Sequence, residues 1–132
     1  MQNTNKMEEK MKVLICKRCG NQVEVINDSG VSMVCCGEKM HELDSKAFDG
    51  AKEKHVPEYK VNQNLVEVVV SSVLHPMEEK HYITWIAVET NKGIQRKWLK
   101  PNDEPKATFA LDDGEEEVKV YSYCNLHGLW EA

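Results

Sequence analysis

The sequence contains no long apolar run, no basic stripe and no convincing helical periodicity. No stretch approaches the roughly 20 apolar residues that a membrane-spanning helix needs, and residues 1–12 lack the apolar centre of a signal peptide. The net charge is −5 and no arginine-rich arm is present, which argues against nucleic acid as a partner. We therefore expect a cytoplasmic protein that neither enters a membrane nor binds nucleic acid.

The second half of the chain carries a regular series of strand signals. Hydrophobic residues make up 41% and charged residues 30% of the sequence, as in ordinary globular proteins. β-branched and aromatic residues concentrate in residues 65–73, 82–89, 94–99, 108–111 and 118–123, with polar turns between them. This pattern predicts an all-β fold in which an antiparallel sandwich or barrel forms the larger domain.

Four of the five cysteines lie near the N-terminus, as Cys16-x-x-Cys19 and Cys35-Cys36. In a chain without a secretion signal, clustered cysteines indicate a metal site rather than disulfides. Four thiolates bind zinc or iron tetrahedrally, and the spacing does not choose between these metals. Because neighbouring strand residues point to opposite faces, Cys35 and Cys36 can share one metal only if the backbone bends, which Gly37 would permit.

The segments around these cysteines predict a small hairpin-like module. Short strands are expected at residues 13–15, 22–26 and 31–34, with a turn at residues 27–30. So few apolar residues cannot bury enough surface for independent stability, and a bound metal would supply the missing folding energy. Residues 42–54 are interpreted as a polar connector. We therefore predict two domains, a metal-stabilised domain at 1–50 and the β-sandwich at 51–132.

A second group of metal-binding residues lies in the larger domain and is rich in nitrogen. It contains four of the five histidines and the remaining cysteine: His55, His75, His81, Cys124 and His127. All fall at the ends of predicted strands, where loops can bring them together. Structural zinc sites stop at four ligands, so this set favours iron and leaves an octahedral metal one open position. The last histidine, His41, is interpreted as an ordinary surface residue.

Two charged residues, Glu53 and Lys54, directly precede His55. Their covalent tether to a candidate ligand keeps both near the proposed metal. Lys54 can attract an anion and deliver protons to it, and Glu53 can act as a temporary sixth ligand.

Together these motifs resemble desulfoferrodoxin, the two-domain form of superoxide reductase, from about Val13 to Trp130. The resemblance rests on five motifs in order: Cys16-Lys17-Arg18-Cys19-Gly20, Cys35-Cys36-Gly37, Glu53-Lys54-His55-Val56-Pro57, His75-Pro76-Met77-Glu78-Glu79-Lys80-His81 and Cys124-Asn125-Leu126-His127-Gly128. The main departure from the family is a longer N-terminal leader before the first cysteine.

The resemblance implies a desulforedoxin-like N-terminal domain with an Fe(Cys)4 centre and a neelaredoxin-like, immunoglobulin-like β-sandwich with a square-pyramidal Fe(His)4Cys centre. In the second centre it implies four equatorial histidines and Cys124 as the axial ligand. The implied reaction is one-electron reduction of superoxide to hydrogen peroxide. Lys54 would attract superoxide and supply protons, and Glu53 would bind the ferric iron at rest. A homodimer that is re-reduced by an external electron donor such as rubredoxin is also implied.

The residues alone leave two other functions open. One is a non-haem iron electron carrier without substrate chemistry, although outer-sphere electron transfer does not need the open position that five ligands leave. The other is a binding module stabilised by zinc, in which the histidines hold a second structural zinc. Zinc also remains the alternative metal for the four-cysteine site.

Overall fold

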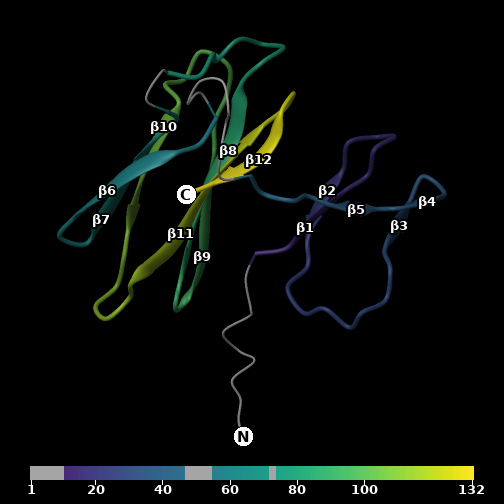
Figure 1. The fold of residues 1–132 in the computed structure, drawn as a ribbon, viewed down its shortest axis with the longest axis horizontal. Coiled ribbons are helices and arrows are strands. Elements are labelled where there is room, and N and C mark those ends of the chain that lie inside the picture. Colours follow the sequence, from purple (N-terminus) through teal and green to yellow (C-terminus); the bar gives the residue numbers. More distant parts are fainter. Residues whose placement is uncertain (1–10, 47–54, 72–73) are drawn as a thin grey trace, which may run out of the picture. The chain divides into compact units, whose positions relative to one another are not determined.

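The structure, a computed structural model, describes residues 11–46, 55–71 and 74–132. Every regular element in these residues is a β-strand, which confirms the all-β prediction. None of the described residues belongs to a helix that is long and apolar enough to cross a membrane. The chain divides into two compact units, residues 1–44 and residues 45–132, which are described separately below (Figure 1).

Unit 1 consists of very short strands arranged around two turns. Its three-stranded sheet has the order β2-β1-β5, built from β1 (Val13–Ile15), β2 (Gln22–Glu24) and β5 (His41–Glu42). A separate hairpin pairs β3 (Val34–Cys35) with β4 (Glu38–Lys39). All of these pairings are antiparallel. Each hairpin turn, between β1 and β2 and between β3 and β4, therefore carries cysteines.

The predicted pairing of residues 22–26 with residues 31–34 is wrong. β2 pairs with β1, across the turn that contains Cys16 and Cys19, and the side chains of Ile26 and Val31 are 94% and 76% exposed. The apolar character of Ile26 and Val31 therefore does not reflect strand pairing. In a unit this small, the tight cysteine-bearing turns determine which strands meet, and strand propensity is a weak guide.

The backbone bend predicted next to Cys35 is present, and it begins one residue earlier than Gly37. Cys36 and Gly37 both have positive φ, 53° and 76°, and they form the two-residue loop between β3 and β4. Two successive positive-φ residues are typical of the type I′ hairpin turn. Cys35 thus ends a strand while Cys36 belongs to the turn, so the two neighbouring thiols are no longer on opposite faces.

Unit 2 contains two antiparallel sheets. One has the order β10-β7-β6 and the other β12-β11-β8-β9. The first is built from β6 (Glu58–Asn62), β7 (Leu65–Val69) and β10 (Lys106–Ala110). The second is built from β8 (Ile83–Thr90), β9 (Gly93–Trp98), β11 (Glu117–Cys124) and β12 (Gly128–Glu131).

The core of unit 2 is formed by side chains from both sheets. Val66 and Phe109 of the first sheet join Ile86, Val88 and Val120 of the second in one fully buried cluster. The two sheets therefore pack face to face as a sandwich, which agrees with the predicted architecture. Burial of each such side chain contributes roughly 1.5–3 kcal/mol, so unit 2 has an apolar core of its own.

Two edge strands of these sheets, β6 and β12, were not predicted from the sequence, whereas the edge strands β9 and β10 were. β6 is exposed along its whole length, so it shows no alternation of apolar and polar residues. Lys46, assigned to the connector, forms a parallel bridge with Trp130 of β12, and Glu42 lies in β5. These segments are held largely by backbone pairing, which leaves little trace in the sequence. Residues 47–54 lie outside the described residues, so the rest of the connector stays a prediction.

Candidate metal centres

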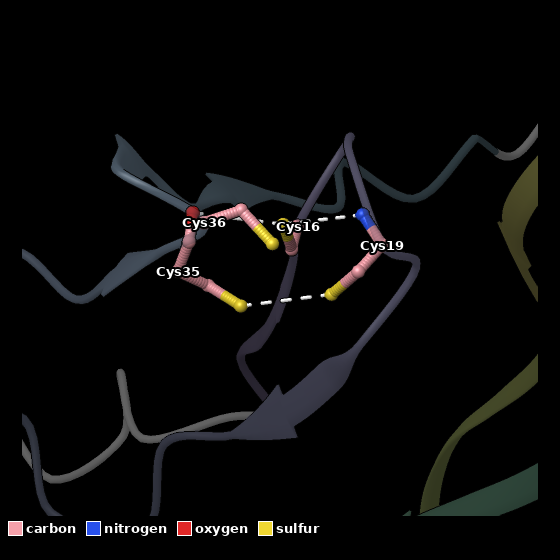
Figure 2. Close-up of side chains that lie close together, drawn as sticks. All are labelled: Cys16, Cys19, Cys35 and Cys36. Atoms are coloured by element: carbon pink, nitrogen blue, oxygen red, sulfur yellow. Dashed lines mark hydrogen bonds between the residues drawn. The ribbon is translucent and has the colours of Figure 1, made fainter.

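The four N-terminal cysteines meet in unit 1 and are called the sulfur centre below. Their sulfur atoms all lie within 4.8 Å of one another, and all four thiols are free. Figure 2 shows the pair Cys35 and Cys36 facing the pair Cys16 and Cys19, with the four sulfurs directed toward a common space. The sulfurs of Cys19 and Cys35 lie 3.6 Å apart. Two turns therefore supply two thiols each, in the number that a tetrahedral metal requires.

The electrostatics of the sulfur centre favour a bound cation. Backbone N–H groups of Cys19 and Arg18 lower the pKa of Cys16 to about 6, and the Cys19 amide lies 3.5 Å from the Cys16 sulfur. Contact with the neighbouring thiols, first that of Cys19, raises the pKa of Cys36 to about 12. The Cys16 thiolate, present at neutral pH, thus opposes ionisation of the neighbouring thiols. A metal cation removes this opposition, because metal ligands must be thiolates.

The second group of candidate ligands meets at one end of the sandwich and is called the histidine centre below. Ligand atoms of His55, His81, Cys124 and His127 lie within 4.8 Å of one another. The His75 ring completes the set, with its centroid 5.0 Å from that of His55 and 4.8 Å from that of His81. The structure therefore brings together all five residues that the sequence analysis selected for this site.

Two of these histidines have a buried nitrogen atom that lacks a hydrogen-bond partner. Among the described residues, the Nε2 atoms of His75 and His81 are both buried without a hydrogen-bond partner. His75 Nδ1 lies 2.7 Å from the carbonyl oxygen of Pro76; because a carbonyl only accepts, Nδ1 carries the proton and Nε2 presents a lone pair. Burial lowers the pKa of His75 to about 4, which keeps the ring neutral. Unpartnered buried acceptors are costly, and a metal ion would satisfy both.

The other two histidines face each other directly. His55 Nε2 lies 3.0 Å from His127 Nδ1, and His127 Nδ1 lies 3.7 Å from the sulfur of Cys124. His127 therefore turns a different ring nitrogen toward the common space than His75 and His81 do. The short turn between Cys124 and His127 explains this choice, since only the nearer nitrogen of the imidazole can point back toward the sulfur.

Burial differs across the histidine centre. Cys124 is fully buried and His75 is 3% exposed, whereas His127 is exposed and His55 and His81 are half-buried. Burial raises the pKa of Cys124, and this is opposed by the backbone N–H groups of Leu126 and His127. A metal would replace the thiol proton. The Cys124 sulfur and the His75 ring would hold the metal from the buried side of the site, and the His127 ring from its exposed side.

Neighbouring residues that the sequence analysis did not select hold the ligands in place. Ser122 donates a hydrogen bond from its hydroxyl to the His55 carbonyl at 2.9 Å. The Trp130 indole stacks on the His55 ring, and the Lys46 ammonium lies 5.2 Å from the centre of the indole ring. Ser122 lies in β11 and Trp130 in β12, and the sequence linked them to the site only through their closeness to Cys124 and His127. Asn125, between Cys124 and His127, is a further supporting residue that the sequence did not indicate.

The predicted pair Glu53 and Lys54 lies outside the described residues, so their roles stay predictions. His41 is exposed on β5, as expected for a surface residue. The donor sets fit two different metals or two states of one metal: four thiolates in the sulfur centre, and four imidazoles with one thiolate in the histidine centre. The two groups can hold two iron ions per chain.

The chain is similar to known proteins over nearly all of its length. Residues 47–132 match the desulfoferrodoxin family, and residues 8–43 match the desulfoferrodoxin N-terminal domain. A desulfoferrodoxin homolog of Archaeoglobus fulgidus is 48% identical over 126 residues, covering 96% of this chain and 99% of the relative. A superoxide reductase of Thermococcus kodakarensis is 36% identical over 104 residues, covering 65% of this chain and 90% of the relative.

The similarity extends to three-dimensional structure. The crystal structure of the superoxide reductase from Treponema pallidum superimposes with a TM-score of 0.81 at 33% sequence identity, covering 93% of this chain and 98% of that chain. The two cysteine-bearing turns, the sandwich and the cluster of imidazoles around a buried thiol thus occur in a chain that the Archaeoglobus fulgidus relative matches over 96% of its length. On these grounds the chain belongs to the desulfoferrodoxin family.

Proposed function

We propose that this protein is a superoxide reductase, which reduces superoxide to hydrogen peroxide at the histidine centre. The observation that carries the proposal is the convergence of four imidazoles and one buried thiol at the end of the sandwich. Five ligands leave an octahedral metal one position for a small ligand, and this position is not needed by a pure electron carrier. Relatives and structural neighbours named as superoxide reductases support the same reaction.

Iron, when bound, supplies the single electron and a coordination site with a thiolate ligand that donates electron density. The reaction consumes one superoxide, one electron and two protons for each hydrogen peroxide. The residues of the chain contribute charge and position. Neutral imidazoles, such as that of His75, leave the positive charge of the metal only partly compensated, which favours an anionic substrate. The buried Cys124 is the one anionic ligand.

Lys54 is proposed to attract superoxide and to supply protons, and Glu53 to occupy the open position in the resting ferric state. Their place next to His55 in the sequence supports both roles. The net charge of −5 would repel a small anion, so a local cation is needed to guide superoxide to the site.

The remaining proposals concern partners and location. We propose that an electron-donor protein such as rubredoxin re-reduces the iron, that iron rather than zinc occupies the sulfur centre, and that the protein protects a cytoplasm against oxidative stress. Free thiols at five positions fit a reducing compartment. A homodimer is also proposed, and the exposed apolar side chains of unit 1, Ile26, Val31, Met33 and Val34, are the kind of surface that a second copy covers.

The product ratio tests the proposed reaction. Excess pre-reduced, iron-loaded protein is mixed anaerobically with a limited pulse of superoxide. One hydrogen peroxide for each superoxide, without dioxygen, is the expected result. One hydrogen peroxide for every two superoxide ions, with dioxygen, indicates dismutation instead. A rate no faster than spontaneous decay, together with failure to bind azide, overturns the proposal in favour of an electron carrier.

The role of Lys54 is tested with a matched pair of variants. Lys80 precedes His81 in the sequence as Lys54 precedes His55. We expect Lys54→Ala to slow superoxide consumption by about tenfold or more, with little change in the iron spectrum. Lys80→Ala should have a much smaller effect. Equal slowing in both variants would replace the specific role of Lys54 with a general effect of charge.

A further inference from the structure

Asn125 makes three hydrogen bonds to the two residues that flank His81. Its side-chain Oδ1 accepts a hydrogen bond from the backbone N–H of Tyr82 at 2.9 Å, and its Nδ2 donates to the backbone carbonyl of Lys80 at 3.0 Å. Its own backbone N–H donates to the carbonyl of Tyr82 at 3.2 Å. Asn125, in the turn between Cys124 and His127, therefore binds the backbone on both sides of another candidate ligand, His81.

These contacts lie where the regular pairing of β11 with β8 ends. The register shifts between Tyr123 and Cys124, and beyond Cys124 the chain turns at once to bring His127 back toward the sulfur. A continuing strand would have offered a backbone carbonyl to the N–H of Tyr82. The side-chain oxygen of Asn125 takes the place of that carbonyl, so the turn forms without leaving the Tyr82 N–H unpaired.

The loop that carries His81 is also held by backbone hydrogen bonds within itself and by the N–H of Asn102, which donates to the carbonyl of Met77 at 2.8 Å. Glu78 and His81 exchange backbone hydrogen bonds of 2.9 and 3.0 Å, which close the loop but do not locate it relative to the sulfur. Asn125 provides a link to the turn that carries the thiol. A side-chain amide has separate acceptor and donor atoms, so Asn125 can accept from one backbone N–H and donate to a nearby carbonyl at the same time.

We propose that Asn125 is a positioning residue, which fixes the imidazole of His81 relative to Cys124 and His127 and thereby sets the geometry of the histidine centre. It acts through the backbone of Lys80 and Tyr82 and does not itself contact a metal. This inference rests on the proposed function only in taking His81 as a ligand, and its measurements need no superoxide.

The chain contains a matched control for this arrangement in Asn91. Its Oδ1 accepts from the backbone N–H of Glu116 at 3.0 Å and its Nδ2 donates to the Gly114 carbonyl at 3.4 Å. Its backbone N–H donates to the Glu116 carbonyl at 3.3 Å. Asn91 therefore joins two loops by the same three hydrogen bonds, but at a turn without metal ligands. Asn91→Ala removes the equivalent two side-chain hydrogen bonds and changes no contact of the candidate ligands.

The experiment compares Asn125→Ala, Asn125→Asp and Asn91→Ala in the full-length, iron-loaded protein. Three quantities are measured for the histidine centre: ferrous-iron affinity in competition with a chelator, the thiolate-to-iron absorption band and the reduction potential. We expect Asn125→Ala to weaken iron binding by about tenfold or more and to shift the band and the potential. Asn125→Asp, which keeps the acceptor but places a carboxylate against the Lys80 carbonyl, should change them in the same direction.

Asn91→Ala should lower the melting temperature without changing any of the three quantities. Wild-type iron affinity, absorption band and potential in Asn125→Ala would overturn the proposal, as would equal changes in Asn91→Ala. If Asn125→Ala does not fold, Asn125→Asp decides the matter by the same criteria. A wild-type protein that fails to reduce superoxide would refute the proposed function and leave these comparisons intact.

Discussion

The indole ring of Trp130 stacks on the imidazole ring of His55, with centroids 4.8 Å apart and planes inclined by 17°. The indole N–H of Trp130 also donates to the backbone carbonyl of His127 at 3.2 Å. One buried side chain thus restrains two candidate ligands whose ring nitrogens lie 3.0 Å apart. Trp130 is therefore part of the support of the histidine centre as well as of the sandwich.

Replacing Trp130 tests this dual role. Trp130→Ala should lower the free energy of unfolding by about 3 kcal/mol, because a large buried ring is lost, and should weaken iron binding at the histidine centre by about tenfold. Urea unfolding and chelator competition measure the two effects. Trp98, which is 76% exposed, is the control, and Trp98→Ala should stay within about 0.5 kcal/mol of wild type. Unchanged iron affinity in Trp130→Ala would contradict the supporting role.

Replacing Cys35 tests whether the two centres are independent. Cys35→Ser removes one sulfur from the tetrahedral set, so the sulfur centre and the fold of unit 1 should both be lost. The histidine centre draws all its candidate ligands from unit 2, so its absorption band and the reduction of superoxide should persist. Iron content per chain, visible spectra and amide hydrogen exchange measure these outcomes. Loss of activity in a variant that keeps the second iron would show that the sulfur centre is needed for turnover.

The depressed pKa of His75 predicts how the stability of the metal-free protein depends on pH. Burial lowers this pKa from 6.5 to about 4 in the folded chain, so between these values the unfolded chain binds more protons. Stability should therefore fall as the pH is lowered from 6.5 toward 4. His75→Gln should flatten this part of the profile, measured by urea unfolding, with the exposed His41→Gln as the control. An identical slope in wild type and His75→Gln would assign the acid sensitivity to other groups.

The sequence was informative where chemistry restricts the choice of residue. Cysteine and histidine have few substitutes as ligands, so both clusters were selected from the sequence, and the valine-rich run at residues 65–73 predicted the strand β7 of the sandwich. Strand pairing in unit 1 was not predictable in the same way, because strands of two or three residues carry no periodicity. Edge strand β6 was missed because all its side chains are exposed.

The supporting residues of the histidine centre could not be predicted from the sequence either. Ser122, Asn125 and Trp130 act through hydrogen bonds and a ring contact, and each residue type has many other uses in proteins. Their roles depend on which backbone atoms the fold brings within reach. The partner of Asn125 lies 43 positions away in the sequence, and no local pattern records such a contact.

The histidine centre is assembled on a sandwich that has its own apolar core, whereas the sulfur centre is assembled from two turns with few buried residues near them. The sandwich can therefore be folded before the histidine centre binds its metal, whereas unit 1 needs the metal of the sulfur centre in order to fold. Iron shortage would therefore affect the two halves of one molecule in different ways. The sulfur-bearing half would be exposed to proteases first, and the other half would remain ready to be reloaded when iron returns.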